Sequence, residues 1–168
     1  MEEIINKVAN SKLKTLNLED FYQDGERVVF DISSWLFQGI VLKEKDFRES
    51  AKNHDWSQYK NQYVALTCSS DAIIPGWAYL LIASYLSPFS RKIVVGNLTD
   101  LETILFAETL QKADFSEYTN LPVIIKGCSN KPVPDNAYIL LLQKLQPIVK
   151  SLFYGEACSS VPLYKQKK

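Results

Sequence analysis

Residues 63–95 read "YVALTCSSDAIIPGWAYLLIASYLSPFSRKIVV" and contain two short apolar runs on either side of a longer segment. The first run, 63–67, and the second, 92–96, are rich in β-branched residues and bounded by turn residues, which is typical of strands buried on both faces. Between them, residues 71–89 place apolar side chains at helical spacing. A strand, a helix and a strand in this order predict a parallel βαβ unit.

The same alternation continues through the rest of the chain. Further apolar runs predict strands, and further segments with helical spacing predict helices. The predicted strands cover 27–32, 122–127 and 152–154, with an edge strand at 161–164 that contains Pro162, and the predicted helices cover 98–113 and 134–150. We therefore expect an α/β fold: a single three-layer domain over residues 1–168 with a mainly parallel central sheet.

The N-terminal part of the chain, residues 1–60, shows a weaker pattern. We expect a turn at Ser33 and Ser34, a short strand over 40–42 and a helix over 46–54. Residues 1–60 would then extend the core at its N-terminal side, by adding strands or by covering an edge of the sheet.

Composition excludes several classes of function. The 168 residues are 46% hydrophobic and 23% charged, with 19 basic and 19 acidic residues, so the chain has no strong field of one sign. We expect no nucleic-acid partner. The longest apolar run, residues 77–86, is shorter than the roughly 20 residues of a membrane span, and the N-terminus lacks an apolar signal segment. These features predict a cytoplasmic protein without a membrane partner.

Three cysteines, Cys68, Cys128 and Cys158, follow predicted strands, and each lies beside a serine. The spacing between the second and third matches one βα unit of about 30 residues, and the spacing between the first and second matches two such units. Each thiol thus falls at the same phase, just past the carboxyl end of a strand. Those ends share one edge of a parallel sheet, where open α/β folds bind ligands. The spacing therefore predicts three thiols on one rim.

The turns that contain Cys68 and Cys128 also favour thiolates over thiols. Helix N-termini follow Cys68 and Cys128, and Lys126 and Lys131 flank the second of these, so positive charge would lower the thiol pKa. Three thiolates could hold zinc or an iron-sulfur cluster, with Asp71, His54 (the one histidine), water or a partner's ligand in the fourth position.

Several stretches resemble family 2480 of the domains of unknown function, a small bacterial family. They are "LEDFYQDGERVVFDISSWLFQGIVLKEKDFRE", "HDWSQY", "TCSSDAIIPGWAY", "KGCSNKPVP" and "GEACSSVPLYK", and the last three contain the cysteines. The family has no established activity. Its genes often lie beside those of the sulfur-mobilisation pathway of iron-sulfur cluster assembly, so the resemblance implies iron-sulfur assembly proteins as partners.

Three hypotheses remain open. The first is a three-cysteine metal or iron-sulfur site that serves cluster assembly, carriage or repair. The second is a thiol-based enzyme or sulfur carrier in which Cys128 is the nucleophile and Cys68 or Cys158 resolves the disulfide or persulfide. The third is a binding or scaffold protein whose cysteines are structural, because free cysteines often act as small buried hydrophobes.

Overall fold

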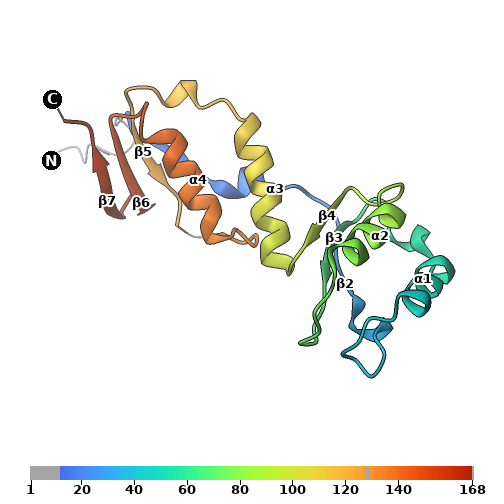
Figure 1. The fold of residues 1–168 in the computed structure, drawn as a ribbon. Helices are drawn as coiled ribbons and strands as arrows, with labels where there is room; N and C mark the ends of the chain where they lie inside the picture. Colours follow the sequence, from blue (N-terminus) through green and yellow to red (C-terminus); the bar gives the residue numbers. More distant parts are fainter. Residues whose placement is uncertain (1–11, 128, 168) are drawn as a thin grey trace, which may run out of the picture. The chain divides into compact units, whose positions relative to one another are not determined.

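The computed structural model describes residues 12–127 and 129–167, which alternate between strands and helices along most of their length (Figure 1). The strands are β1 (Lys14–Leu16), β2 (Arg27–Asp31), β3 (Tyr63–Thr67), β4 (Lys92–Val95), β5 (Pro122–Ile125), β6 (Ser151–Glu156) and β7 (Ser159–Lys165). The α-helices are α1 (Glu44–Asn53), α2 (Gly76–Leu86), α3 (Leu98–Lys112) and α4 (Asp135–Leu145). Short 3-10 helices are η1 (Leu18–Phe21), η2 (Ile32–Trp35), η3 (Trp56–Tyr59) and η4 (Ser116–Tyr118). Within this described part, no helix has the length and apolar character needed to cross a bilayer.

The strands form two sheets, with the orders β1-β5-β6-β7 and β2-β3-β4. The strands pair in parallel throughout, except that β7 runs antiparallel to β6. The prediction of an α/β fold with mainly parallel strands is confirmed, but two sheets stand where we expected a single central one. The reason is that β5 pairs with the distant β1 and not with β4, and apolar periodicity does not say which strands pair.

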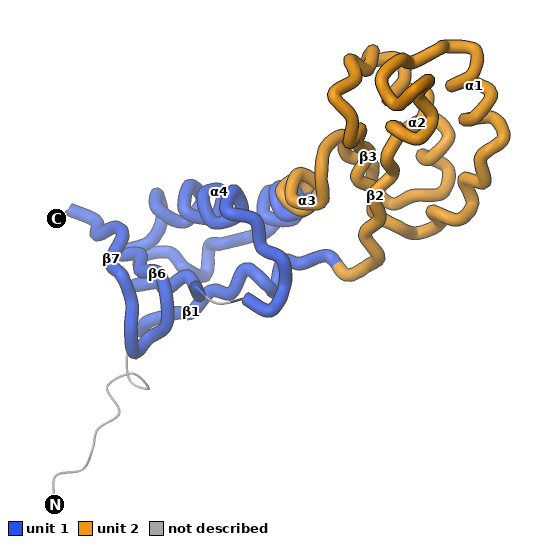
Figure 2. Tube along the Cα trace, turned by 90° about the horizontal axis from the view of Figure 1, so that it is seen from below, with its two compact units in different colours: residues 1–23, 105–168 blue, residues 24–104 orange. Residues whose placement is uncertain are grey.

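The chain divides into two compact units, each with one sheet (Figure 2). Unit 1 contains residues 1–23 and 105–168, and unit 2 contains residues 24–104. Unit 2 is therefore inserted in the sequence of unit 1, and α3 begins in unit 2 and ends in unit 1. The single domain over 1–168 stays a prediction, because it concerns whether the two units unfold together.

The N-terminal segment adds one strand to the edge of each sheet, β1 and β2, as predicted. The predicted helix over 46–54 is present as α1, and the predicted turn at Ser33 lies within η2. The predicted strand over 40–42 is wrong, because Val41 makes only an isolated bridge with Phe37. Gln38 and Gly39 have positive φ angles of 51° and 73°, so the loop turns back on itself and does not run beside another strand.

The two units repeat the same order of elements. Unit 2 has β2, η2, α1, η3, β3, α2 and β4, and unit 1 has β1, η1, the end of α3, η4, β5, α4 and β6. From α1 onward, corresponding residues are 59 positions apart without a gap, as Phe47 and Phe106 or Asn61 and Asn120 show. These two asparagines both have positive φ, 62° and 59°, so the same residue makes the same turn before each central strand.

Packing explains many of the repeated residues. Each unit buries one face of its sheet under two helices, and corresponding positions form the two cores. These pairs are Phe47 and Phe106, Val64 and Val123, Ala78 and Ala137, Ile82 and Leu141, and Leu86 and Leu145. Because the cores match, differences between the units at the sheet edges are the more informative guide to function.

Unit 2 also contains a nearly buried ion pair between β2 and α3. The Arg27 Nε atom lies 2.6 Å from Oε1 of Glu102, and the two side chains are 10% and 6% exposed. The guanidinium also lies 4.8 Å from the centre of the Tyr63 ring. This pair ties the start of α3 to the sheet of unit 2.

Candidate functional site

The cysteines that the sequence predicts as metal ligands belong to different units. Cys68 follows β3 in unit 2 and is half-buried, and Cys158 is exposed in the turn between β6 and β7 in unit 1. Cys128 lies outside the described residues, and its neighbours Gly127 and Ser129 follow β5 in unit 1. Because β5 and β6 are parallel, these neighbours and Cys158 lie at the carboxyl edge of one sheet, while Cys68 follows a strand of the other.

The two further predicted ligands, His54 and Asp71, do not form a metal site with other residues of the described part of the chain. The His54 Nε2 atom is 3.0 Å from the Tyr59 hydroxyl, and its ring packs 4.6 Å from that of Trp56. Burial lowers the pKa of His54, although the charge of Asp55 partly offsets this. Asp71 is exposed on the loop between β3 and α2. Over residues 12–127 and 129–167, no three His, Cys, Asp or Glu side chains gather closely enough to hold a metal ion.

The first two Cys-Ser pairs, at Cys68 and Cys128, are offset by one position relative to the repeat of the two units. Strands, helices and turn residues recur after 59 positions, whereas the first two cysteines are 60 positions apart, so Cys68 corresponds to Gly127 and Cys128 corresponds to Ser69. The prediction that these two thiols share one phase of the repeat is therefore wrong by one position. The residue that does recur in register is a serine, Ser70 in unit 2 and Ser129 in unit 1.

We call the segments that follow the central strands the corners: residues 68–72 in unit 2 and residues 127–131 in unit 1. Hydrogen bonds support their alignment. In unit 2 the amide of Ala72 donates to Ser70 Oγ at 3.4 Å, and in unit 1 the amide of Lys131 donates to Ser129 Oγ at 3.2 Å. Each acceptor serine therefore bonds to the amide two residues later, a local turn typical of serine. The two corners follow the central strands β3 and β5 and lead into α2 and α4.

In unit 2 a carboxylate from the neighbouring strand holds the corner. Asp31, the last residue of β2, accepts hydrogen bonds at Oδ1 from the amides of Ser33 and Ser69, at 3.0 and 3.1 Å. The hydroxyls of Ser33 and Ser69 are themselves 3.0 Å apart. Burial raises the pKa of Asp31, but the hydrogen bonds from Ser69 and Ser33 outweigh that effect and lower the pKa to about 2. Asp31 is therefore charged at neutral pH, and its hydrogen bonds join the end of β2 to the corner.

In unit 1 a different side chain enters the corner. Glu19, on η1, accepts hydrogen bonds at Oε1 from the amide of Asn130, from the amide of Lys131 at 3.0 Å and from the Ser129 hydroxyl at 3.0 Å. The bond from the Asn130 amide is the main reason that the pKa of Glu19 is lowered. The corner of unit 1 is thus a carboxylate-binding site that the chain fills with its own glutamate.

The thiol of Cys68 has polar neighbours at the same corner of unit 2. Its Sγ atom lies 3.3 Å from the Ser70 hydroxyl and donates to the Ser70 carbonyl at 3.7 Å. Burial, and second the charge of Cys68, raise the pKa of Tyr79 on α2, which places the phenol near the thiol. The polar neighbours of the thiol are therefore a hydroxyl, a carbonyl and a phenol.

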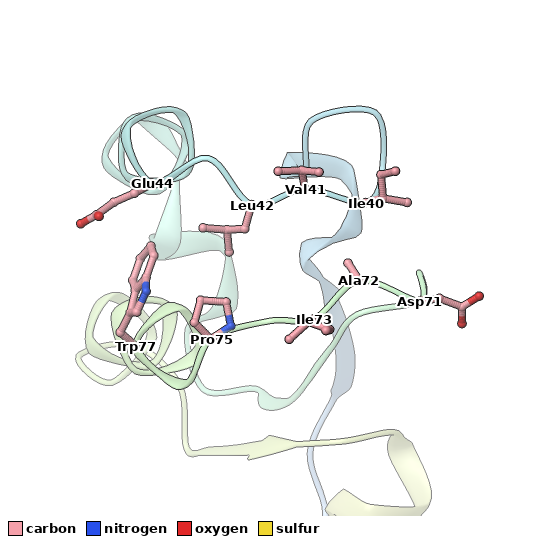
Figure 3. Close-up of a pocket in the computed structure, with 9 residues that line it drawn as sticks. All are labelled: Ile40, Val41, Leu42, Glu44, Asp71, Ala72, Ile73, Pro75 and Trp77. Atoms are coloured by element: carbon pink, nitrogen blue, oxygen red, sulfur yellow. The ribbon is translucent and has the colours of Figure 1, made fainter.

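Beside this corner, two loops of unit 2 enclose an open groove of about 580 Å³ (Figure 3). The lining residues are Ile40, Val41, Leu42 and Glu44 from one loop and Asp71, Ala72, Ile73, Pro75 and Trp77 from the other. Seven of these nine side chains are apolar, and the two carboxylates lie at opposite ends, Glu44 at one and Asp71 at the other. Ile40 is 60% exposed and Ile73 is 94% exposed, so these side chains do not contribute to the core.

Sequence reasoning missed the groove and both carboxylates. Asp31 ends the edge strand β2, in "FDISS", and Glu19 follows the edge strand β1, in "LNLED". In the sequence such polar residues look like ordinary parts of the first turn of a short helix. The repeat with a spacing of 59 positions was a signal that could have led to the comparison of the two corners. It does not reveal the hydrogen bonds, because these join residues 38 and 112 positions apart in the chain.

Comparisons with known proteins place the chain in a family without assigning a chemistry. Neither curated proteins nor solved structures include a match to this chain. A family match does cover almost the whole sequence, including both units and all three cysteines. Over residues 2–166 the chain belongs to the family described as "Protein of unknown function (DUF2480)".

Proposed function

We propose that this protein is a binding protein that holds an apolar segment of another protein in the groove of unit 2. One observation carries the proposal: Ile40 and Ile73, from two different loops, line the same groove and remain 60% and 94% exposed. An exposed apolar patch of this kind gives no folding benefit and is typical of an interaction site.

Local contacts hold the two loops of the groove in place. The loop that carries Ile40 and Val41 is closed by paired backbone hydrogen bonds between Phe37 and Val41, at 2.8 and 3.1 Å. The Lys43 Nζ atom lies 3.3 Å from the centre of the Phe37 ring and covers it. On the opposite wall, Pro75 is the residue before α2 and restricts the backbone. A loop that is ordered before binding loses less entropy when the partner arrives.

A display library of random seven-residue peptides tests the proposal. Enriched peptides should be apolar, and Ile73→Ser should weaken their binding about tenfold, because burying such a side chain contributes about 1.5 kcal/mol or more. Leu80→Ser is the matched control, since Leu80 is 72% exposed on α2 but does not line the groove. Equal loss in both variants, or no enriched peptide, would contradict the proposal.

A second candidate is the zinc or iron-sulfur site of Cys68, Cys128 and Cys158, with iron-sulfur assembly proteins as partners. It is favoured by the free, exposed thiol of Cys158 at the carboxyl edge of the sheet of unit 1. Metal and acid-labile sulfide analysis of anaerobically purified protein tests it, and Cys→Ser variants assign the ligands. We further propose a cytoplasmic location, because thiols such as those of Cys68 and Cys158 stay reduced there.

The thiol enzyme or sulfur carrier that uses Cys128 makes a different prediction. An alkylating probe should then react with one cysteine much faster than with the other two. Equal reactivity of the three thiols, without protection by a metal, would leave the binding function as the remaining proposal.

A further inference from the structure

We infer that the corner of unit 2 at residues 70–72 binds an acidic side chain of the partner segment, in the way that the corner of unit 1 binds Glu19. This inference rests on the proposed function, because Asp71 and Ala72 line the groove directly after Ser70. It names the chemistry of the partner: a glutamate or aspartate flanked by apolar residues.

The corner of unit 1 shows what such a site binds. Glu19 lies on the short helix η1, after Leu18 and before Asp20 and Phe21. Its Oε1 atom accepts hydrogen bonds from two consecutive backbone amides and one serine hydroxyl. Consecutive amides that converge on one point form a concave anion site. The ligand in unit 1 is therefore a peptide carboxylate with apolar neighbours.

The donors of unit 1 have counterparts in unit 2. With a spacing of 59, Ser129 corresponds to Ser70, Asn130 to Asp71 and Lys131 to Ala72. Both corners begin after the central strand, contain the same hydrogen bond from an amide to a serine hydroxyl oxygen, and end at a proline that caps the next helix. The chain therefore presents amides and a hydroxyl in the same order in both units.

The ligand has no counterpart in unit 2. Asn17 and Asp31 cap η1 and η2 in the same way, so the residue two positions later, Glu19 in unit 1, corresponds to Ser33. Ser33 is shorter and its hydroxyl lies 3.0 Å from that of Ser69. Within the described part of the chain, the amide of Asp71 donates no hydrogen bond, and the residue is exposed. An external carboxylate can take this place.

Two carboxylates that line the groove oppose such a ligand. One of them, Glu44, lies at the far end of the groove and pairs with Arg48 at 2.8 Å. The Asp71 side chain is exposed at the end of the groove, where unit 1 has the neutral Asn130. A further carboxylate near the corner, that of Asp31, already accepts hydrogen bonds from the amides of Ser33 and Ser69. Asp71→Asn should thus make the corner of unit 2 resemble that of unit 1 and strengthen binding of an acidic peptide.

Two synthetic peptides patterned on the sequence at 16–22 test the inference. One is acetyl-LNLENFY-amide, which keeps Glu19 as its sole carboxylate, and the other, acetyl-LNLQNFY-amide, replaces it by glutamine. In titrations of the whole protein followed by NMR, the acidic peptide should shift the amide signals of Asp71 and Ala72. It should bind about fivefold more tightly than the neutral peptide, because hydrogen bonds to a charged acceptor are stronger. Asp71→Asn should tighten the acidic peptide about threefold and leave the neutral one unchanged.

The outcomes separate this inference from the proposed function. If Ile73→Ser weakens both peptides but they bind equally, the groove is supported and the carboxylate inference is overturned. If binding needs the glutamate but not Ile73, the corner is supported and the groove is not. If the amide signals of Asp71 and Ala72 stay unchanged at several millimolar peptide, the inference is overturned outright.

Discussion

The two units have the same order of elements and matching cores, but they differ in their corners and in the edge strands of their sheets. Unit 1 fills its corner with Glu19 and covers β6 with the extra strand β7. In the described part of the chain, the Asp71 amide of unit 2 donates no hydrogen bond and lies near exposed isoleucines, and β4 pairs with no strand other than β3. The difference teaches that the shared residues serve folding, while the proposed binding surface lies where unit 2 departs from unit 1.

The largest expected effect tests the similarity of the cores. Phe47→Ala and Phe106→Ala remove corresponding side chains that are 0% and 1% exposed, so each should lower the free energy of unfolding by about 3–5 kcal/mol. Denaturant titration and calorimetry measure this. If the chain is a single domain, both variants shift one common transition. Two transitions, each moved by only one variant, would show that the units unfold separately. The exposed Leu80→Ala should change little.

The next effect concerns the ion pair of unit 2. Glu102→Gln leaves the nearly buried Arg27 without its carboxylate and should destabilise the protein by about 3 kcal/mol. The matched control is Glu44→Gln, because Glu44 pairs with Arg48 at 2.8 Å but the two side chains are more than half exposed. That variant should cost less than about 0.5 kcal/mol. Similar losses of unfolding free energy in the two variants would contradict the expectation.

The hydrogen bonds that Asp31 accepts in unit 2 should make the stability of the protein depend on pH. The pKa of Asp31 falls from 3.8 to about 2 on folding, so its carboxylate stabilises the fold above pH 4 and this contribution is lost as the pH falls through 2. Asp31→Asn should cost about 1–2 kcal/mol at pH 7. The difference from the unaltered protein should shrink steadily between pH 4 and pH 2. A difference that is constant over that range would show that the charge of Asp31 has no role.

The smallest effect on stability, and the sharpest test of the comparison, comes from opening unit 1. Glu19→Ala removes a half-buried carboxylate and its hydrogen bonds at the corner, and it should lower the melting temperature only slightly. It should, however, create a second site for the acidic peptide, reported by the NMR signals of the Asn130 and Lys131 amides. If these signals do not respond, the corner of unit 1 binds Glu19 only because η1 positions it.

Much of the fold could be predicted from local pattern. The strands β3, β4 and β5 and the helices α2 to α4 follow from apolar periodicity, and Pro162 in β7 is compatible with its place at an edge. The candidate site could not be predicted in the same way. Cys68 stands out in the sequence, yet its thiol only bonds to Ser70, while the ordinary-looking Ile73 is the most exposed large apolar residue of the described chain.

The sequence by itself determined the α/β class, because strand and helix periods are properties of consecutive residues. It also determined that two similar cores form, since buried positions recur at a spacing of 59 along the chain. Only the tertiary structure decided that β5 pairs with β1, so that there are two sheets, and that Glu19 occupies one corner while Ser33 leaves the other open. Those outcomes depend on contacts between residues far apart in the chain, whose hydrogen bonds and packing leave no period in the sequence.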